Sequence, residues 1–354
     1  MLDLTFGVDS FADIMTDGNG TRLSDAETVR RTVDLGVIAE ESGLDVFSLG
    51  EHYRADMMDS APPVILSAIA ARTTTLHLGT SVTVLSTQDP VRVFHQYSTL
   101  NAISGGRAQL TVGRASTIDS FPLFGFDLRD YDELFEEKLE LWLKLLDGGP
   151  ITWDGDSRPP IDGITLHPQL EAPLPTWVGV GGSPQSVVRA ARHGLPLLLA
   201  IIGGAPQRFA GHVELYRRAL AEFGRPALPV GQHGIGLIAD TDDEARDAFW
   251  PAWRGVTEKM AAERGWHAAT EESFLHEITN GALMVGSPET VARRIAQCFA
   301  DLSLSRFDLK PDVGGLSYDD RERTIRLLGT KVAPRVRELV AAGLATTSAE
   351  TSHA

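Results

Sequence analysis

A glutamate and a histidine stand side by side directly after a short apolar run, at Glu51 and His52. Histidine exchanges protons near neutral pH, and an adjacent carboxylate can shift its pKa, so the pair is a candidate for acid–base catalysis. A histidine that only hydrogen-bonds a loop carbonyl would leave the same pattern. Spacing alone does not separate the two interpretations.

Small or cationic residues end two further apolar runs. One run closes in G-T-S-V, ending at Ser81 and Val82, and a glycine followed by small polar residues lets a flat ligand approach the backbone. Inward packing of small residues inside a barrel explains the same pattern, which by itself favours that structural interpretation. Arg114 follows the other run and could bind an anionic ligand group, or could pair with a neighbouring acid such as Asp119.

Two glycine-rich turns follow later apolar runs, and the first of them stands directly before a proline that can open a helix. Free backbone N–H groups and the helix dipole make such a turn a cradle for phosphate. The spacing differs from the dinucleotide fingerprint G-x-G-x-x-G, which would also follow the first strand. We predict that the two turns bracket one phosphate. The candidate donors are Gly181, Gly182, Ser183, Gly203 and Gly204.

Other common chemistries leave no motif in the chain. The acidic and histidine residues lack metal-ligand spacing, and there is no H-E-x-x-H pattern or cysteine cluster, so no metal is predicted. The G-x-S-x-G nucleophile elbow is absent as well. Cys298, the single cysteine, lies in a helix-like apolar pattern and is predicted to be a buried core residue.

These residues follow strand-like runs that alternate with helix-like runs along the chain. Eight such units predict an α/β fold, a (β/α)₈ TIM barrel with insertions, in which the C-terminal ends of the parallel strands meet at one face. A doubly wound open sheet is the alternative. The predicted strands cover residues 4–9, 46–49, 76–85, 108–112, 176–180, 196–201, 230–239 and 306–309.

The domain prediction is a single barrel over residues 1–343 with two excursions. Residues 148–175 are rich in Gly, Pro and Asp and are predicted to form a hairpin on the barrel rim. Residues 255–280 are predicted to be irregular, and a long irregular segment between regular units is typical of a lid. The tail, residues 344–354, is predicted to be disordered.

Composition narrows the range of partners. The chain has 354 residues and a formal net charge of −16. An acidic surface repels phosphate backbones and anionic lipid, so neither nucleic acid nor a membrane is an expected partner. The N-terminus lacks a basic region followed by a long apolar run, so no signal peptide is predicted and the expected location is the cytoplasm.

A set of short motifs follows one another in a fixed order. They are E-E-S-G-L-D at 40–45, G-E-H-Y at 50–53, A-A-R-T-T-T-L-H-L-G-T at 70–80, D-P-V-R at 89–92, L-N-A-I-S-G-G-R at 100–107, V-G-R at 112–114 and P-T-W-V-G-V-G-G-S at 175–183. In this order and spacing the chain resembles the bacterial luciferase-like flavin monooxygenase family, over residues 4–339.

The resemblance implies a TIM barrel that binds FMN or, in one branch, a deazaflavin. Reduced FMN, often supplied by a separate flavin reductase, reacts with O₂, and the activated oxygen oxidises a small organic substrate. The chain would then be a two-component monooxygenase and, as is usual in the family, a homodimer. The alternatives are a deazaflavin-dependent dehydrogenase on the same barrel and a flavin-binding protein without catalysis.

The resemblance also assigns roles by position. His52 matches the family's catalytic histidine, with Glu51 beside it near the flavin. Ser81 and Val82 match the stretch under the flavin ring, where the family often has a non-prolyl cis peptide, and Arg114 matches an arginine near the flavin. The phosphate-binding turn matches Gly181, Gly182 and Ser183.

Departures from the family pattern limit what the resemblance implies. Tyr53 stands where luciferases often have a second histidine, and Gly113 stands where they have a reactive cysteine. The polar residues of the luciferase phosphate turn are replaced by Gly181 and Gly182. Light emission with aldehyde oxidation is therefore not expected.

Overall fold

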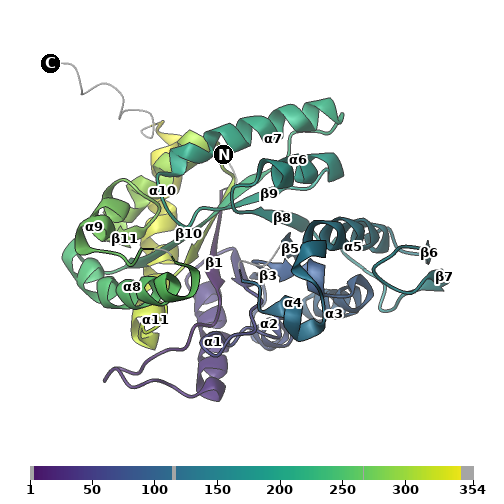
Figure 1. Ribbon diagram of the computed structural model, residues 1–354. Helices are drawn as coiled ribbons and strands as arrows, with labels where there is room; N and C mark the ends of the chain where they lie inside the picture. Colours follow the sequence, from purple (N-terminus) through teal and green to yellow (C-terminus); the bar gives the residue numbers. More distant parts are fainter. Residues whose placement is uncertain (1–3, 114–116, 266, 344–354) are drawn as a thin grey trace.

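The computed structural model describes residues 4–113, 117–265 and 267–343. Within this part, the chain forms a barrel of parallel strands surrounded by helices (Figure 1). The predicted disordered tail, residues 344–354, lies outside the described residues.

Ten strands form the main sheet, in the order β3-β2-β1-β12-β10-β9-β8-β5-β4, with β11 beside β10. The two ends meet because the N–H of Leu78 donates to the Arg107 carbonyl and the N–H of Gln109 donates to the Leu78 carbonyl, each at 2.9 Å. β3 and β4 are two halves of the third predicted strand; counting them once and setting β11 aside leaves eight barrel strands. The predicted TIM barrel is confirmed. The strands are β1 (Thr5–Ser10), β2 (Val46–Leu49), β3 (His77–Thr80), β4 (Thr83–Val84), β5 (Leu110–Gly113), β8 (Thr176–Val180), β9 (Leu197–Ala200), β10 (Val230–Ile238), β11 (Met284–Gly286) and β12 (Arg306–Lys310).

Helices fill the connections and begin at short polar side chains. Ser24, Asp89 and Ser183 each accept an N–H from the first turn of the helix that follows them, which satisfies a backbone donor that the helix leaves open. The helices are α1 (Asp25–Glu41), α2 (Pro62–Ala70), α3 (Pro90–Ser104), α4 (Ser120–Phe124), α5 (Tyr131–Leu146), α6 (Pro184–His193), α7 (Ala210–Glu222), α8 (Asp242–Arg264), α9 (Glu271–Thr279), α10 (Pro288–Leu302), α11 (Tyr318–Leu327) and α12 (Ala333–Ala341).

Two insertions extend the barrel on opposite sides. Within 148–175, β6 (Pro150–Trp153) and β7 (Ile161–Thr165) pair antiparallel and project beyond α5 (Figure 1). On the other side, α8, α9 and β11 form the second insertion.

The prediction of an irregular segment at 255–280 is wrong, because the second half of α8 and the whole of α9 occupy most of it. Pro251 lies inside α8, where it has no backbone N–H to donate within the helix. Aromatic packing stabilises this helix: Phe249 and Trp250 of α8 stack on Phe274 of α9, with ring centroids 6.2 and 5.0 Å apart. These residues belong to a second apolar core that is separate from the one around the barrel.

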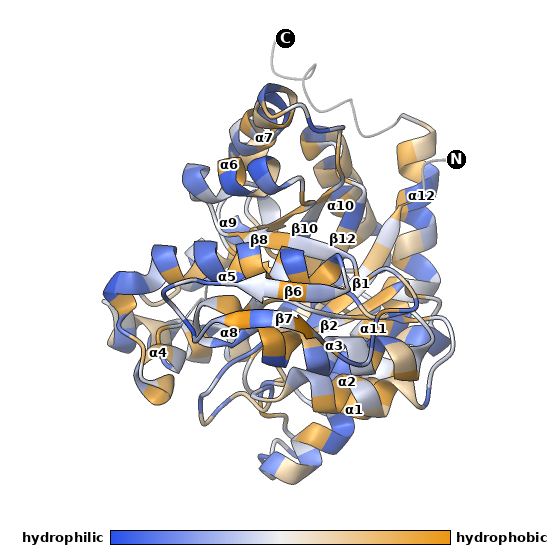
Figure 2. Cartoon of the chain, turned by 90° about the vertical axis from the view of Figure 1, so that its right-hand side faces the viewer, coloured by the Kyte–Doolittle hydropathy of each residue, from blue (hydrophilic) through white to orange (hydrophobic). Residues whose placement is uncertain are grey.

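The main core lies between the strands and the surrounding helices. Figure 2 shows helices whose hydrophobic residues face the barrel and whose hydrophilic residues face outwards. Trp142 of α5 and Phe6 of β1 are among its fully buried side chains, and Cys298 of α10 is also buried, as predicted. Within the described part of the chain, no helix combines the length and apolar character needed to cross a membrane.

The inside of the barrel holds paired charges. The guanidinium of Arg306 donates to the carboxylate of Asp308 through Nε at 2.9 Å and Nη2 at 2.7 Å, and its Nη1 donates to Gln109 at 3.3 Å. The carboxylate of Asp9 lies 2.6 Å from Nδ1 of His233. All five side chains are buried. A buried charge without a partner is costly, so these pairs constrain which residues the strands can carry.

Replacing Asp308 by Ala leaves the Arg306 guanidinium buried without its carboxylate, and should lower the free energy of unfolding by about 3–5 kcal/mol. The control Asp34→Ala removes an exposed carboxylate that pairs with Arg72 at 2.7 Å, and should cost less than about 1 kcal/mol. Urea unfolding measures both. Equal losses in the two variants would contradict this account of the barrel interior.

Candidate active site

The parallel barrel brings the predicted site residues to one face, the mouth, where the strands end. Glu51 and His52 follow β2, and Ser81 and Val82 join β3 to β4. The two glycine-rich turns follow β8 and β9. Arg114, after β5, lies outside the described residues.

His52 is buried at the mouth and held by a residue that sequence reasoning missed, Asp59. Nδ1 of His52 lies 2.8 Å from Oδ2 of Asp59, and the backbone N–H of His52 donates to Oδ1 of the same carboxylate at 3.1 Å. The side chain of Asp59 is fully buried. No motif marks this aspartate, because the contact depends on how the loop after β2 folds back.

Burial and pairing act in opposite directions on the His52–Asp59 pair. Burial by itself would lower the pKa of His52, but the hydrogen bond and charge of Asp59 outweigh it, so the pKa of His52 is raised. Burial raises the pKa of Asp59 to about 6, against the opposing effect of His52. The two groups therefore compete for a proton in the range in which enzymes work.

Glu51 is buried, and its carboxylate faces away from the barrel interior towards the next strand. Its Oε2 accepts the N–H of Val84 at 2.9 Å, and its Oε1 accepts the hydroxyl of Tyr53 at 2.6 Å and the amide of Gln88 at 2.5 Å. Burial and the charge of Glu51 raise the pKa of Tyr53. Through these hydrogen bonds, Glu51 connects the loop that carries His52 to β4.

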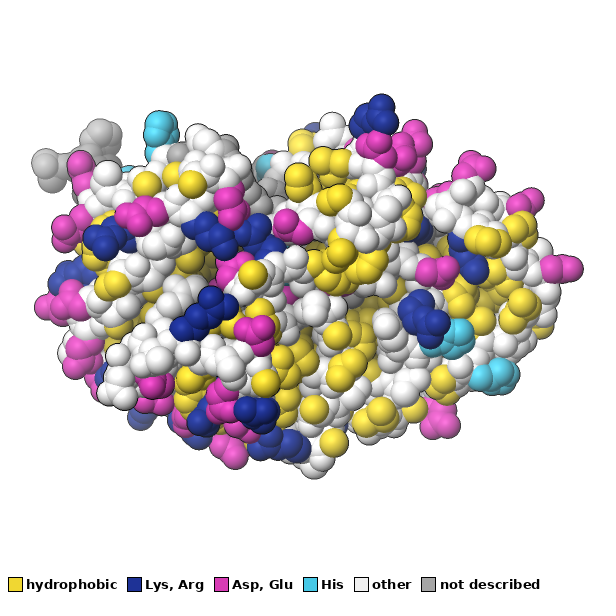
Figure 3. All heavy atoms as spheres, turned by 60° about the horizontal axis from the view of Figure 1, so that its bottom comes forward, with side chains coloured by type: hydrophobic (Ala, Val, Ile, Leu, Met, Phe, Trp, Pro, Cys, Tyr) yellow, Lys and Arg dark blue, Asp and Glu magenta, His cyan; other side chains and the backbone are white. Residues whose placement is uncertain are grey.

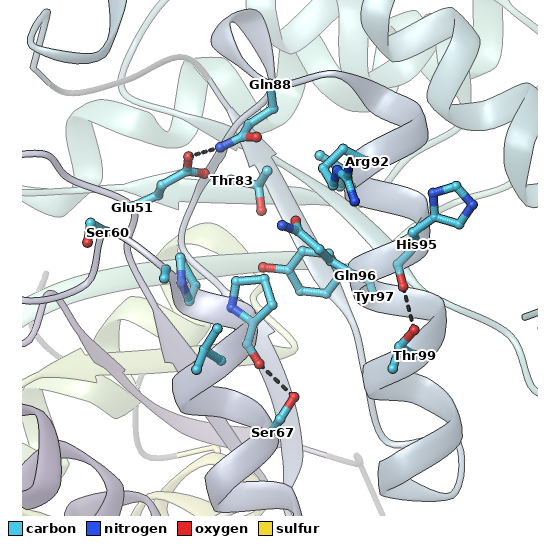
Figure 4. A pocket seen from close by; sticks show the side chains of 15 residues that line it. Glu51, Ser60, Ser67, Thr83, Gln88, Arg92, His95, Gln96, Tyr97 and Thr99 are labelled. Carbon is cyan, nitrogen blue, oxygen red and sulfur yellow. Dashed lines mark hydrogen bonds between the residues drawn. The ribbon is translucent and has the colours of Figure 1, made fainter. Parts of the chain in front are cut away.

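A cavity of about 570 Å³ reaches Glu51 from the outer surface, between α2 and α3. Figure 4 shows Gln88 bonded to Glu51 at one side of this cavity, with Thr83 and Tyr97 pointing towards its interior. His52 is not among the residues that line it. The cavity thus lies between α2 and α3 and meets the candidate site at Glu51 and not at His52.

Ser81 and Val82 are joined by a cis peptide bond, at the position where the resemblance implied one. The side chain of Val82 packs against two glycines on neighbouring strands. A Cβ added to Gly113 would lie 2.8 Å from Cγ2 of Val82, and one added to Gly179 would lie 2.6 Å from Cγ1. A side chain at residue 113, where luciferases have a cysteine, would therefore clash with Val82 in this structure.

The turn at 181–183 leads into the N-terminus of α6. The hydroxyl of Ser183 accepts the N–H of Ser186 at 3.4 Å and donates to the side chain of Gln185 at 2.9 Å. A Cβ added to Gly181 would meet no atom within 4 Å, so the space beside this backbone is open. The turn keeps the form of an anion cradle at a helix N-terminus.

The second glycine turn already has an anionic partner. The N–H of Gly204 donates to the carboxylate of Glu277, at 3.1 Å to Oε2, and the N–H of Ala282 donates to the same oxygen at 3.0 Å. Glu277 belongs to α9, inside segment 255–280. Its carboxylate stands where the sequence predicted a phosphate, so only an anion that displaces Glu277 could use the Gly204 donor.

Arg54 joins the loop after β2 to two other segments near the mouth. Its guanidinium donates to Glu263 of α8 at 2.8 Å and lies 3.5 Å from Asp119, which precedes α4. Lys259 of α8 also pairs with Asp56 of the same loop, at 2.5 Å. Segment 255–280 therefore contacts both the His52 loop, through Glu263 and Lys259, and the turn after β9.

Among the described residues, one group has the ligand atoms to hold a metal: Glu136, Glu140 and His193, within 4.8 Å of one another. Glu136 is, however, already paired with Arg189 at 2.6 Å and with Arg192. Two guanidinium groups supply the positive charge that a metal would bring. We interpret the group as an ion-pair cluster that joins α5 to α6.

Comparison with known proteins places this geometry among relatives. The sequence model of the family "Luciferase-like monooxygenase" matches residues 10–306. A "Luciferase-like monooxygenase" of Escherichia coli K12 is 30% identical over 244 residues, which are 68% of this chain and 69% of the relative. The alkanal monooxygenase alpha chain of Photorhabdus luminescens is 28% identical over 247 residues, covering 67% of this chain and 66%, just under two thirds, of the relative.

Solved structures share the fold at lower identity. A monooxygenase from Streptomyces bottropensis has a TM-score of 0.79 at 21% identity, covering 94% of this chain and 99% of that chain. The oxygenating constituent of 3,6-diketocamphane monooxygenase from Pseudomonas putida, in complex with FMN, has a TM-score of 0.75 at 18% identity and covers 94% and 98%. A coenzyme F420 dependent tetrahydromethanopterin reductase from Methanopyrus kandleri has a TM-score of 0.70 at 18%, covering 94% and 99%.

Replacing Glu277 by Gln removes the carboxylate charge beside the Gly204 donor but keeps an acceptor. If an anion binds at this turn, the loss of about 1 kcal/mol of repulsion should lower the Kd of inorganic phosphate about fivefold. The control Glu272→Gln makes the same charge change at an exposed position of α9. Calorimetric titration with phosphate measures both, and equal Kd values in the two variants would remove Gly204 from the anion site.

Proposed function

Since the chain belongs to the luciferase-like monooxygenase family, we propose that it uses reduced FMN and O₂ to oxidise a small organic substrate. The observation that carries the proposal is a buried, carboxylate-held histidine at the same face of the barrel as an open glycine turn that begins a helix. A proton-exchanging group and an anion cradle at one mouth are what an oxidoreductase with a phosphate-bearing cofactor requires.

The residues at the mouth fit a flavin mononucleotide. The open turn of Gly181, Gly182 and Ser183 would hold the phosphate, and Ser81 and Val82 would face the ring. The bound flavin supplies the electrons and the reaction with O₂, which no side chain can provide. The chain itself binds and orients the cofactor, excludes water and moves protons.

Within this arrangement His52 would hold or donate a proton beside the flavin. Its raised pKa keeps part of the imidazole protonated near neutral pH, and a protonated imidazole can pass its proton to an oxygen atom formed in the reaction. Glu51 contributes indirectly, because its bonds to Val84 and Tyr53 fix the loop that carries His52.

Apolar side chains at the rim support an organic substrate with hydrophobic character. Ile118, Leu123, Phe124 and Leu128 are between 45% and 62% exposed, and the ring of Phe124 contacts Tyr53 with centroids 4.8 Å apart. A patch of exposed apolar residues beside a catalytic mouth is typical of a binding surface. We also propose that segment 255–280 covers this mouth, since it contacts the loops after β2 and β9.

The protein is further proposed to form a homodimer through α2 and α3. Neither helix contains an Asp or Glu, although the chain carries a net charge of −16, and Val64 and Ile103 are 70% and 52% exposed. Figure 3 shows this side of the molecule, where hydrophobic side chains gather at the centre and acidic ones lie mostly around them. Two copies of an acidic protein meet at a lower electrostatic cost where acidic side chains are absent.

Mixing the protein and reduced cofactor with O₂ tests the reaction. We expect reduced FMN to be reoxidised at a rate that depends on the protein, and reduced coenzyme F420, a deazaflavin, to be left unchanged. Anaerobic hydride transfer from F420 to a carbonyl compound would instead favour a dehydrogenase. Binding of FMN without any effect on its reoxidation would favour a non-catalytic flavin-binding protein.

Replacing His52 by Ala should slow the protein-dependent step about 100-fold, the range of general acid–base catalysis, while FMN binding changes little. Stopped-flow absorbance gives the rate, and fluorescence titration gives the Kd. The control His77→Ala removes an exposed histidine at the start of β3, the opposite end of the barrel. An unchanged rate in His52→Ala would remove His52 from the mechanism.

Placing a charge on the α2–α3 face should separate the proposed dimer. In Val64→Glu two copies would bring like charges together at the interface, so sedimentation is expected to shift from a dimer to a monomer. The control Ile164→Glu adds the same charge at a 52% exposed position of β7 and should remain dimeric. A wild-type protein that sediments as a monomer would rule the interface out.

A further inference from the structure

Both oxygens of the Asp59 carboxylate contact the same residue, His52. One oxygen lies 2.8 Å from the ring nitrogen Nδ1 of His52, and the other accepts the backbone N–H of His52 at 3.1 Å. The ring orientation and the position of the main chain are therefore fixed by the same side chain.

Packing around Gly50 shows how tightly the pair is enclosed. A Cβ at Gly50 would lie 2.6 Å from Oδ2 of Asp59, 2.6 Å from the ring of Phe11 and 3.0 Å from Cε1 of His52. The rings of Phe11 and His52 are in contact, with centroids 4.5 Å apart. Three side chains thus converge where residue 50 has none, which leaves His52 little freedom to turn.

Charged groups from three other elements face this pair. Lys310 of β12 lies 3.1 Å from Asp13 of the loop after β1 and 3.2 Å from Asp312, and it also sits 4.4 Å from the Phe11 ring centroid. Arg321 of α11 lies 3.9 Å from Asp312. On the far side of Phe11, the ring of His233 stacks at 6.2 Å.

The carboxylates of this cluster favour a proton on His52. Asp59 and Asp13 both raise the pKa of the imidazole, whereas burial and the positive charge of Lys310 lower it, and the net direction is upward. Because these four side chains are buried, water screens their charges poorly.

We propose that Asp59 is a positioning residue that orients the His52 ring through Nδ1 and keeps a proton on it, so that His52 acts as an acid. This inference rests on the proposed function for its catalytic meaning. In the step concerned, His52 gives its proton to the reacting oxygen atom, becomes neutral imidazole, and regains a proton from solvent. The direction of the His52 pKa shift agrees with this assignment, since the hydrogen bond and charge of Asp59 raise it against the effect of burial.

The test is the titration of His52 in the cofactor-free protein, followed by NMR of its ring proton and assigned by its loss in His52→Gln. In the wild type, His52 should titrate above the ordinary value of about 6.5. In Asp59→Asn, which keeps the shape but loses the charge, the largest effects that oppose burial are lost and the pKa of His52 should fall by one unit or more. The imidazolium fraction at high pH would then drop about tenfold.

The control is Asp56→Asn, which removes a charge from the same loop at a partly exposed carboxylate paired with Lys259. It should leave the His52 titration unchanged. The rate of reduced-flavin reoxidation against pH gives a second readout: its alkaline limb should move to lower pH in Asp59→Asn and stay in place in Asp56→Asn.

The outcomes separate the inference from the proposed function. The role of Asp59 is overturned if the wild-type His52 titrates below 6.5, or if the pKa of His52 shifts equally in the two Asn variants. The wild-type pKa tests the role of Asp59 even if Asp59→Asn does not fold. If His52 titrates as expected but the protein does not affect flavin reoxidation, Asp59 still positions His52 and the proposed monooxygenase function is refuted.

Discussion

Charges buried inside the barrel must be paired, and this constraint determines which residues occupy the barrel interior and the mouth. Arg306 is held by Asp308 and Asp9 contacts His233 within the strands, while Lys310 lies between two aspartates where the strands end. Each pair joins different elements or fixes the rotamer of a strand residue. An unpaired buried charge at any of these positions would lower the free energy of unfolding by several kcal/mol, so the two members of a pair depend on each other.

The His52–Asp59 pair is the last member of this series and faces the site. It lies in the loop after β2, at the mouth, and its imidazole belongs to the side-chain type that exchanges protons in the pH range where enzymes work. The surrounding glycines serve the same end, since Gly50 leaves room for the pair and Gly113 leaves room for Val82. The fold and the candidate chemistry thus depend on the same packing. The barrel itself is common to many functions, and the candidate chemistry depends on the residues at its mouth.

Much of the architecture could be predicted from local signals. Short apolar runs between glycines and prolines marked all eight barrel strands, and Ser24 marked the start of α1. β11 escaped prediction because three residues carry too little pattern. The second half of α8 escaped it because the aromatic packing of α8 against α9 is a tertiary contact with no local signal.

The candidate site was predictable in part. His52 was identified from its place after a strand, but its partner Asp59 was not, because loops bring residues together without any periodic signal. The neighbouring Glu51 was predicted as a second catalytic group, and its hydrogen bonds to Val84 and Gln88 favour an anchoring role that the sequence does not indicate. The direction of a side chain, which decides such roles, is set by tertiary contacts.

We propose that the mouth of the barrel, and not the cavity between α2 and α3, is the flavin site. A crystal structure of the protein soaked with FMN distinguishes these two places. We expect the flavin ring beside His52, with the phosphate on the backbone N–H groups of residues 181–183. A flavin bound in the cavity that reaches Glu51 from outside, or a mouth that stays empty at saturating FMN, would contradict it.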